Sequence, residues 1–230
     1  MYYVAGTLNN LPALYYKTNR YEPAEKHFLE ALDIRRKLAI ANPKAYLSYV
    51  AGTLNNFAAL YYQTNRYESA EKHYLEALEI YRKLAIANPK AYLSDVAVTL
   101  NNLAALYSET NRYEPAEKHF LEALDIRRKL AQNSPDAFED DLAMVLYNIG
   151  ILHNEIHQYE KAVKYLKESL ALTEKLAKKY PEVYGKRLND TKNALRNTTP
   201  LRKYMISIVI LILIIIFVPS IIKRVRSKNQ

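Results

Sequence analysis

The sequence predicts an all-α protein in which tandem helix-turn-helix units stack into an α-solenoid, followed by one C-terminal transmembrane helix. Three observations carry this prediction. The 230-residue chain repeats itself with a period of 46 residues, apolar residues within each repeat recur at steps of three and four, and a long uncharged apolar run follows the repeats. A fixed period in this range is typical of solenoids, because each unit buries its apolar face against its neighbours.

The repeat is nearly perfect at its start. Residues 3–48 and 49–94 align without a gap and are identical at 39 of 46 positions. Residues 95–140 continue the pattern at the same period, and residues 141–186 continue it more loosely. Residues 187–195 resemble only the start of another unit, and we expect them to form a short capping helix.

Each unit is expected to contain two antiparallel helices. In the third unit the apolar spacing predicts a first helix over about 94–110, with Ser94 as its N-cap. Residues 111–112 are expected to form the turn. The second helix should begin near Tyr113, because Pro115 fits only the first turn of a helix.

The second helix should end where asparagine and proline cluster, at 133–135, as at 42–43 and 88–89. Its polar residues are expected to form a solvated face; these are Glu117, Lys118, Glu122, Arg127, Arg128 and Lys129.

Composition and charge exclude several classes of function. The absence of cysteine excludes a disulfide framework, a thiolate metal site and a cysteine nucleophile. The net charge of +9 is local, because residues 196–230 hold seven Lys and Arg and no acid, leaving 26 basic and 24 acidic residues elsewhere. We therefore expect no nucleic-acid binding. The first ten residues lack a basic start and a long apolar stretch, so no signal peptide is predicted.

Small and aromatic residues recur in each unit at a spacing that resembles the tetratricopeptide repeat. In the third unit they are Leu100, Leu103, Ala104, Tyr107, Tyr113, Ala116, Phe120 and Ala123. The run Thr-Leu-Asn-Asn-(Leu/Phe)-X-Ala-Leu-Tyr and the longer unit are similar to the kinesin light chain type of this repeat. The resemblance covers residues 3–186. It implies a right-handed α-solenoid whose concave groove binds peptides or helices of other proteins.

Some positions depart from that pattern. Pro12 takes a small-residue position inside the first helix, where it should kink or shorten the helix. In the fourth unit His153 replaces the tyrosine, Leu166 the phenylalanine and Ser169 an alanine. Such drift is expected of a terminal unit.

The resemblance implies that the first helix of each unit lines the groove. The candidate groove residues are Asn9, Asn10, Tyr16, Asn55, Asn56, Tyr62, Asn101, Asn102, Ser108, Tyr147, Asn148 and Asn154. Side-chain amides can pair with the backbone of an extended peptide. The alternative is that one asparagine of each pair ties adjacent units together. A clamp for a peptide carboxylate is not expected, because Lys17 is the only basic residue at these positions, whereas Glu109 and Glu155 are acidic.

The apolar run predicts a membrane anchor. Residues 204–222 are long enough for a transmembrane helix, after a basic linker at 196–203 and before a basic tail at 223–230. The flanking basic residues are Arg202, Lys203, Lys223, Arg224, Arg226 and Lys228. We expect a single-pass, tail-anchored protein with the repeats facing the cytoplasm. The opposite orientation would be indicated by glycosylation of Asn189.

Catalysis has no sequence support, since no phosphate-binding loop, HExxH motif or nucleophile elbow is present. No cofactor is expected. His153 and His157 lie four residues apart, but two ligands make no closed zinc site, and we interpret them as a surface pair. The predicted function is a membrane-tethered scaffold that binds a protein or peptide. The alternatives are self-association through an uncapped N-terminal repeat, or a fragment of a longer array.

Overall fold

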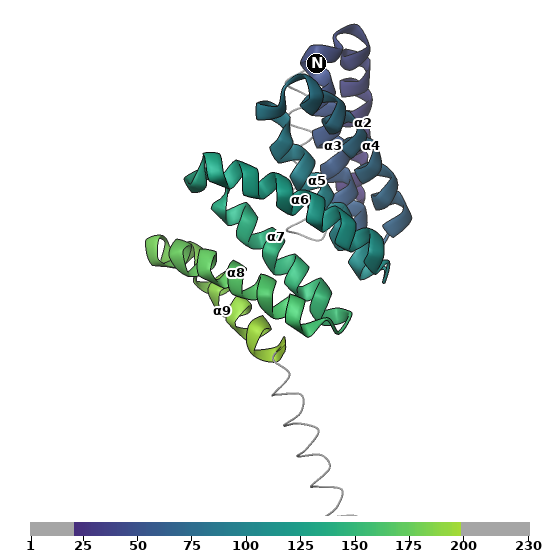
Figure 1. The fold of residues 1–230 in the computed structure, drawn as a ribbon. Coiled ribbons are helices and arrows are strands. Elements are labelled where there is room, and N and C mark those ends of the chain that lie inside the picture. The colour runs from purple at the N-terminus through teal and green to yellow at the C-terminus, as the bar shows by residue number, and fades with distance from the viewer. Residues whose placement is uncertain (1–20, 199–230) are drawn as a thin grey trace, which may run out of the picture.

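The structure, a computed structural model, describes residues 21–198, and these fold into eight α-helices. In chain order they are α2 (Tyr21–Ala41), α3 (Pro43–Gln63), α4 (Tyr67–Ala87), α5 (Pro89–Glu109), α6 (Tyr113–Asn133), α7 (Pro135–Glu155), α8 (Tyr159–Lys179) and α9 (Pro181–Thr198). Successive helices pack antiparallel and the pairs stack into an all-α solenoid (Figure 1). This confirms the predicted fold class over the described residues.

The 46-residue period is visible in the helix starts. One set of helices begins at Tyr21, Tyr67, Tyr113 and Tyr159, and the other begins at Pro43, Pro89, Pro135 and Pro181. The two sets form two layers. Helices α3, α5, α7 and α9 contact one another along one layer, so this layer is the inner side of the curved stack.

The first helix of the third unit was predicted to start near residue 94, about one and a half helical turns too late. Helix α5 begins at Pro89, and the side chain of Asn88 is its N-cap, accepting a hydrogen bond from the Ala91 amide at 3.3 Å. Asn42 caps α3 in the same way. Proline suits the first helical position because its missing N–H would have no intrahelical partner there. The Asn-Pro pair thus ends one helix and begins the next, and Ser94 lies inside α5.

The same proline signal explains the last described helix. We predicted a short helix over 187–195, but α9 runs from Pro181 to Thr198. Pro181 opens it as Pro135 opens α7. The capping element is therefore a full first helix rather than a short one.

The predicted turn at 111–112 is present between α5 and α6. Asn111 adopts a positive φ of 58°, as Asn65 does at 57°. Asparagine tolerates this left-handed conformation better than most residues. The Asn111 side-chain oxygen accepts a hydrogen bond from the Tyr113 hydroxyl at 2.7 Å, which ties the turn to the start of α6.

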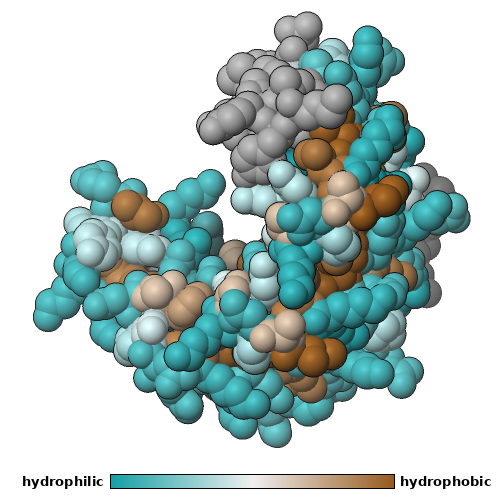
Figure 2. Space-filling model, turned by 90° about the horizontal axis from the view of Figure 1, so that it is seen from above, coloured by the Kyte–Doolittle hydropathy of each residue, from teal (hydrophilic) through white to brown (hydrophobic). Residues whose placement is uncertain are grey.

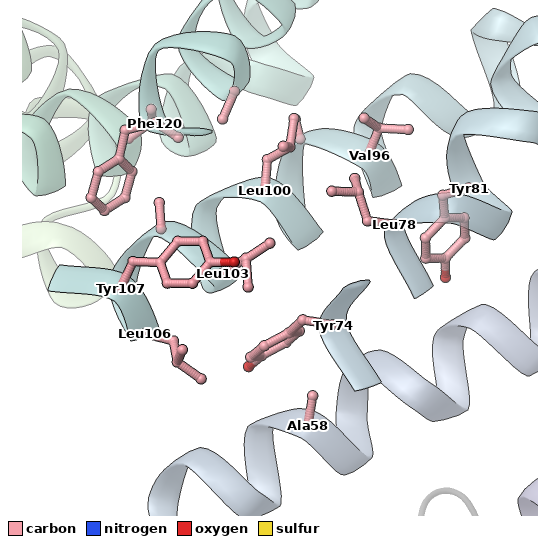
Figure 3. Close-up of a cluster of buried hydrophobic side chains, with 14 of the residues drawn as sticks. Ala58, Tyr74, Leu78, Tyr81, Val96, Leu100, Leu103, Leu106, Tyr107 and Phe120 are labelled. Atoms are coloured by element: carbon pink, nitrogen blue, oxygen red, sulfur yellow. The ribbon is translucent and has the colours of Figure 1, made fainter. Parts of the chain in front are cut away.

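The main cluster of buried apolar side chains extends from α2 to α7, and Figure 3 shows part of a cluster of this kind. A smaller cluster lies between α2, α3 and α4. Alanines at the signature positions, such as Ala58 and Ala104, are fully buried and let the helices approach closely. Larger side chains such as Tyr74 and Phe120 fill the space between helices. Burying one aromatic side chain of this size stabilises the fold by about 2–3 kcal/mol.

Polar contacts link each unit to the next. Glu71 of α4 accepts hydrogen bonds from the Tyr107 hydroxyl at 3.0 Å and from Arg112 at 2.6 Å, and the Arg112 guanidinium lies 4.2 Å from the Tyr107 ring. One unit earlier, Glu25, Tyr61 and Arg66 repeat this arrangement. On the outer layer, ion pairs join Arg36 to Glu76, Arg82 to Glu122 and Arg128 to Glu168.

One residue assigned to the solvated face is in fact buried. Arg127 of α6 is 1% exposed and donates hydrogen bonds to the Ser94 hydroxyl and carbonyl of α5. Arg35, two periods earlier, is also buried, at 6% exposed. Each guanidinium bonds to the adjacent first helix, so these arginines lie between helices.

The interpretation of His153 and His157 as a surface pair was also wrong. His153 is fully buried and stacks on Tyr165, with ring centroids 5.5 Å apart. His157 lies in the turn between α7 and α8, at a φ of 62°. The His153 ring therefore lies in the core, whereas the His157 residue is exposed in the turn.

Several predictions fall on residues outside 21–198. They are the kink at Pro12, the candidate residues Asn9, Asn10 and Tyr16, the flanking basic residues from Arg202 to Lys228, and the transmembrane helix at 204–222. Among the helices that the structure describes, none is apolar and long enough to span a bilayer.

Candidate binding groove

The inner layer of first helices forms a groove, seen as the hollowed side of the space-filling view (Figure 2). A pocket of about 240 Å³ lies in it and draws its lining from three consecutive units. The lining residues are Tyr62, Ala105, Ser108, Glu109, Phe120, Tyr147, Asn148 and Ile151. Four of them, namely Tyr62, Ser108, Tyr147 and Asn148, are groove residues that the sequence predicted.

A second pocket of about 220 Å³ continues the groove toward α9. It shares Tyr147 and Asn148 with the first pocket and adds Met144, Arg187 and Asp190. The Arg187 guanidinium pairs with the Asp140 carboxylate beside it. The two pockets therefore form one path along α7.

The asparagine ladder connects neighbouring first helices. Asn148 donates a hydrogen bond to the Asn101 side-chain oxygen at 3.0 Å, and Asn102 donates to Asn55 at 3.5 Å. Asn101 is only 7% exposed. These contacts correspond to the alternative in which asparagines tie adjacent units together. Asn56 differs, because its side chain is exposed on α3.

The walls of the first pocket carry tyrosine hydroxyls that stay protonated at neutral pH. Burial, followed by the nearby negative charges of Glu109 and Glu155, raises the pKa of Tyr62. Burial and the charge of Asp190 raise the pKa of Tyr147. Both hydroxyls are therefore available as hydrogen-bond donors.

Two carboxylates stand at the rim. Glu109 lines the first pocket, and Glu155 accepts a hydrogen bond from the Ser108 hydroxyl at 2.9 Å. Both side chains are exposed. The two glutamates that argued against a clamp for a peptide carboxylate therefore lie at the pocket and beside it.

Five described candidates line neither pocket: Asn55, Asn56, Asn101, Asn102 and Asn154. The side-chain oxygen of Asn154 is buried without a hydrogen-bond partner. Sequence reasoning missed Met144, Arg187 and Asp190. Met144 lies one helical turn before Tyr147, and Asp190 lies one 46-residue period after Met144. Applying the same spacing one turn earlier in α7 and then in α9 would have found both residues.

The described stretch offers no metal centre, because no three metal-ligating side chains gather anywhere in it. His73 and His119, which are one period apart, pack against aromatic rings. His73 lies edge-on to Phe57, and His119 stacks on Tyr107 with centroids 5.6 Å apart.

Two family models described as tetratricopeptide repeats match the chain. One matches residues 49–129, and the other matches residues 4–39 and 142–179. Together they cover more than half of the sequence. The chain belongs to the tetratricopeptide repeat family, whose domains mediate protein–protein interactions.

The fold is similar to that of two crystal structures. BtubC (BKLC) from P. vanneervenii superposes with a TM-score of 0.62 at 21% identity, covering 88% of this chain and 82% of that one. The apo form of RapI superposes with a TM-score of 0.64 at 19% identity, covering 85% and 67%. At these identities the similarity concerns the fold alone. Comparison with curated protein sequences gives no match.

Proposed function

We propose that this protein is a non-enzymatic scaffold that binds an extended peptide or a helix of a partner protein in its inner groove. The observation that carries the proposal is the pocket of about 240 Å³ built by α3, α5, α6 and α7. Its tyrosine walls supply apolar area together with hydrogen-bond donors, the combination that protein-binding sites favour. Because three units contribute, only the stacked repeats create this site.

Site-specific photocrosslinking tests this function. A benzoylphenylalanine is introduced in the full-length chain at Asn56 or Gln63, exposed positions of the inner helix α3. Matched positions are Glu30 of α2 and Asp125 of α6, which are exposed on the outer layer. We expect a partner band from the two inner positions only. Equal crosslinking from both layers, or none from α3, would contradict groove binding.

We propose further that the C-terminal apolar run tethers the scaffold to a membrane, with the repeats facing the cytoplasm. The support is the sequence: residues 205–222 contain no charge, and six of the chain's Lys and Arg residues flank them at Arg202, Lys203, Lys223, Arg224, Arg226 and Lys228. Fractionation of the tagged chain with and without residues 204–230 tests it. The intact chain is expected in the membrane fraction and resistant to carbonate. Equal distribution of the two forms would refute the tether.

A further inference from the structure

The pocket in the groove carries a charge that its neighbours do not balance. We propose that it receives an arginine side chain from an extended segment of the partner protein, with the guanidinium against Tyr62 and Tyr147 and its charge met by Glu109 and Glu155. This inference rests on the proposed function and specifies the chemistry of the partner.

The rim carboxylates stand out against the other glutamates of the solenoid. Elsewhere a glutamate is commonly paired with an arginine one unit away, as Glu71 is with Arg112 and Glu168 is with Arg128. Within residues 21–198, neither Glu109 nor Glu155 forms an ion pair, and no Lys or Arg lines the pocket. Glu109 therefore gives the pocket one negative charge, Glu155 adds a second beside it, and no Lys or Arg of the described lining balances them.

Glu155 is held in place for such a partner. The Ser108 hydroxyl donates to its Oε2 across the gap between α5 and α7. Glu109 lies one residue after Ser108 and lines the pocket itself. Tyr62 and Glu109 line the same pocket, and Glu155 lies beside it through its hydrogen bond with the lining residue Ser108.

The remaining lining suits the rest of an arginine side chain. Ala105, Phe120 and Ile151 provide apolar surface for its methylene groups. Tyr62 and Tyr147 place aromatic side chains in the lining, and a cation over the face of such a ring gains about 0.5–2 kcal/mol. A guanidinium can stack on a ring and bind a carboxylate through two parallel hydrogen bonds, whereas an ammonium cannot. The chemistry thus favours arginine over lysine and disfavours an acidic segment.

The first part of the test identifies the preferred peptide. A display library of random nonapeptides is selected on the full-length chain in mild detergent. A parallel selection uses the double variant Glu109→Gln/Glu155→Gln, and a control uses Glu30→Gln/Asp125→Asn, which removes the same charge from the outer layer. We expect arginine to be enriched at one peptide position on the wild type and the control, and this enrichment to vanish on the groove variant.

The second part changes only the peptide, so it does not depend on the folding of any variant. Fluorescence anisotropy compares the best selected peptide with versions carrying citrulline or lysine at the enriched position. Citrulline keeps the shape and removes the charge, and we expect it to weaken binding to the wild type about tenfold or more. Lysine should weaken binding less than citrulline does.

Each outcome is decisive. Selected peptides without arginine, or citrulline peptides that bind as well as arginine peptides, would overturn the arginine pocket while leaving groove binding intact. A selection that enriches no peptide at all, together with absent crosslinks at Asn56 and Gln63, would remove the proposed function as well.

Discussion

Arg127 of α6 forms an ion pair with Asp141 of α7, with 2.9 Å between Nη1 and Oδ2, although the arginine side chain is only 1% exposed. The same guanidinium bonds to Ser94 of α5. One side chain therefore joins the three helices α5, α6 and α7. Burial lowers the pKa of Arg127, and the charge of Asp141 opposes this effect.

Removing the partner of this buried charge should be costly. We expect Asp141→Asn to lower the free energy of unfolding by about 1–3 kcal/mol, because a buried cation loses its counter-charge. The matched change Glu168→Gln breaks the more exposed pair with Arg128 and should cost less than about 1 kcal/mol. Urea unfolding followed by circular dichroism measures both. Equal losses would show that Arg127 is balanced without Asp141.

Much of the fold could be predicted from the sequence, because period and apolar spacing are properties of a single unit. The turn at 111–112 and the start of α6 at Tyr113 follow from local signals. The burial of Arg127 could not be predicted, since its partners Ser94 and Asp141 belong to other helices and come close only after stacking. The helix start at Pro89 was missed because one Asn-Pro signal serves two helices.

The candidate site was predictable to a similar degree. The family resemblance and the repeat spacing together placed Tyr62, Ser108, Tyr147 and Asn148 in one groove, and the structure brings all four to one pocket. The spacing of the sequence could not predict which groups the asparagine side chains bond to. The bond from Asn148 to Asn101 depends on the distance between adjacent first helices, which no single unit specifies.

Acidification should destabilise the solenoid through two histidines, the buried His153 and the partly buried His119. Burial lowers the pKa of His119 and of His153. The unfolded chain takes up these protons near pH 6.5, whereas the folded chain takes them up only at lower pH, so the unfolded state binds more protons. The contribution of these histidines to the free energy of unfolding is therefore fully present above about pH 6.5. It falls below that pH, by at most about 1.4 kcal/mol per pH unit for each histidine.

Urea midpoints measured from pH 7.5 to 5.5 test this dependence. His153→Phe removes one titrating ring while keeping an aromatic side chain, and it should reduce the slope. A stability that stays constant or rises over this range would contradict the assignment.

The fourth unit exchanges two aromatic residues relative to the third. Tyr107 stacks on His119 in the third unit, and His153 stacks on Tyr165 in the fourth. Position 153 is equivalent to 107 and position 165 to 119, so the tyrosine and the histidine are interchanged between the two units. The single change His153→Tyr would crowd two tyrosines together and should destabilise the protein by about 1–2 kcal/mol. Adding Tyr165→His should recover that loss, because the two changes together recreate the third-unit pair, in which the Tyr107 hydroxyl also donates to Glu71. A double-mutant cycle of unfolding free energies gives the coupling. Additive effects would show that the two positions are independent.

The packing of α7 against α8 in the fourth unit depends on a missing side chain. A Cβ atom on Gly150 of α7 would lie 2.6 Å from Cγ of Leu166 in α8, closer than packed atoms allow. We expect Gly150→Ala to destabilise the protein by about 1–3 kcal/mol despite the better helix propensity of alanine. Gly185→Ala is the matched control, because a Cβ there meets nothing within 4 Å, and it should stabilise α9 by about 0.5–1 kcal/mol. Thermal unfolding of both variants separates packing from propensity. If Gly150→Ala raised the melting temperature as Gly185→Ala does, Leu166 would have room to move, and contact between α7 and α8 would not require glycine.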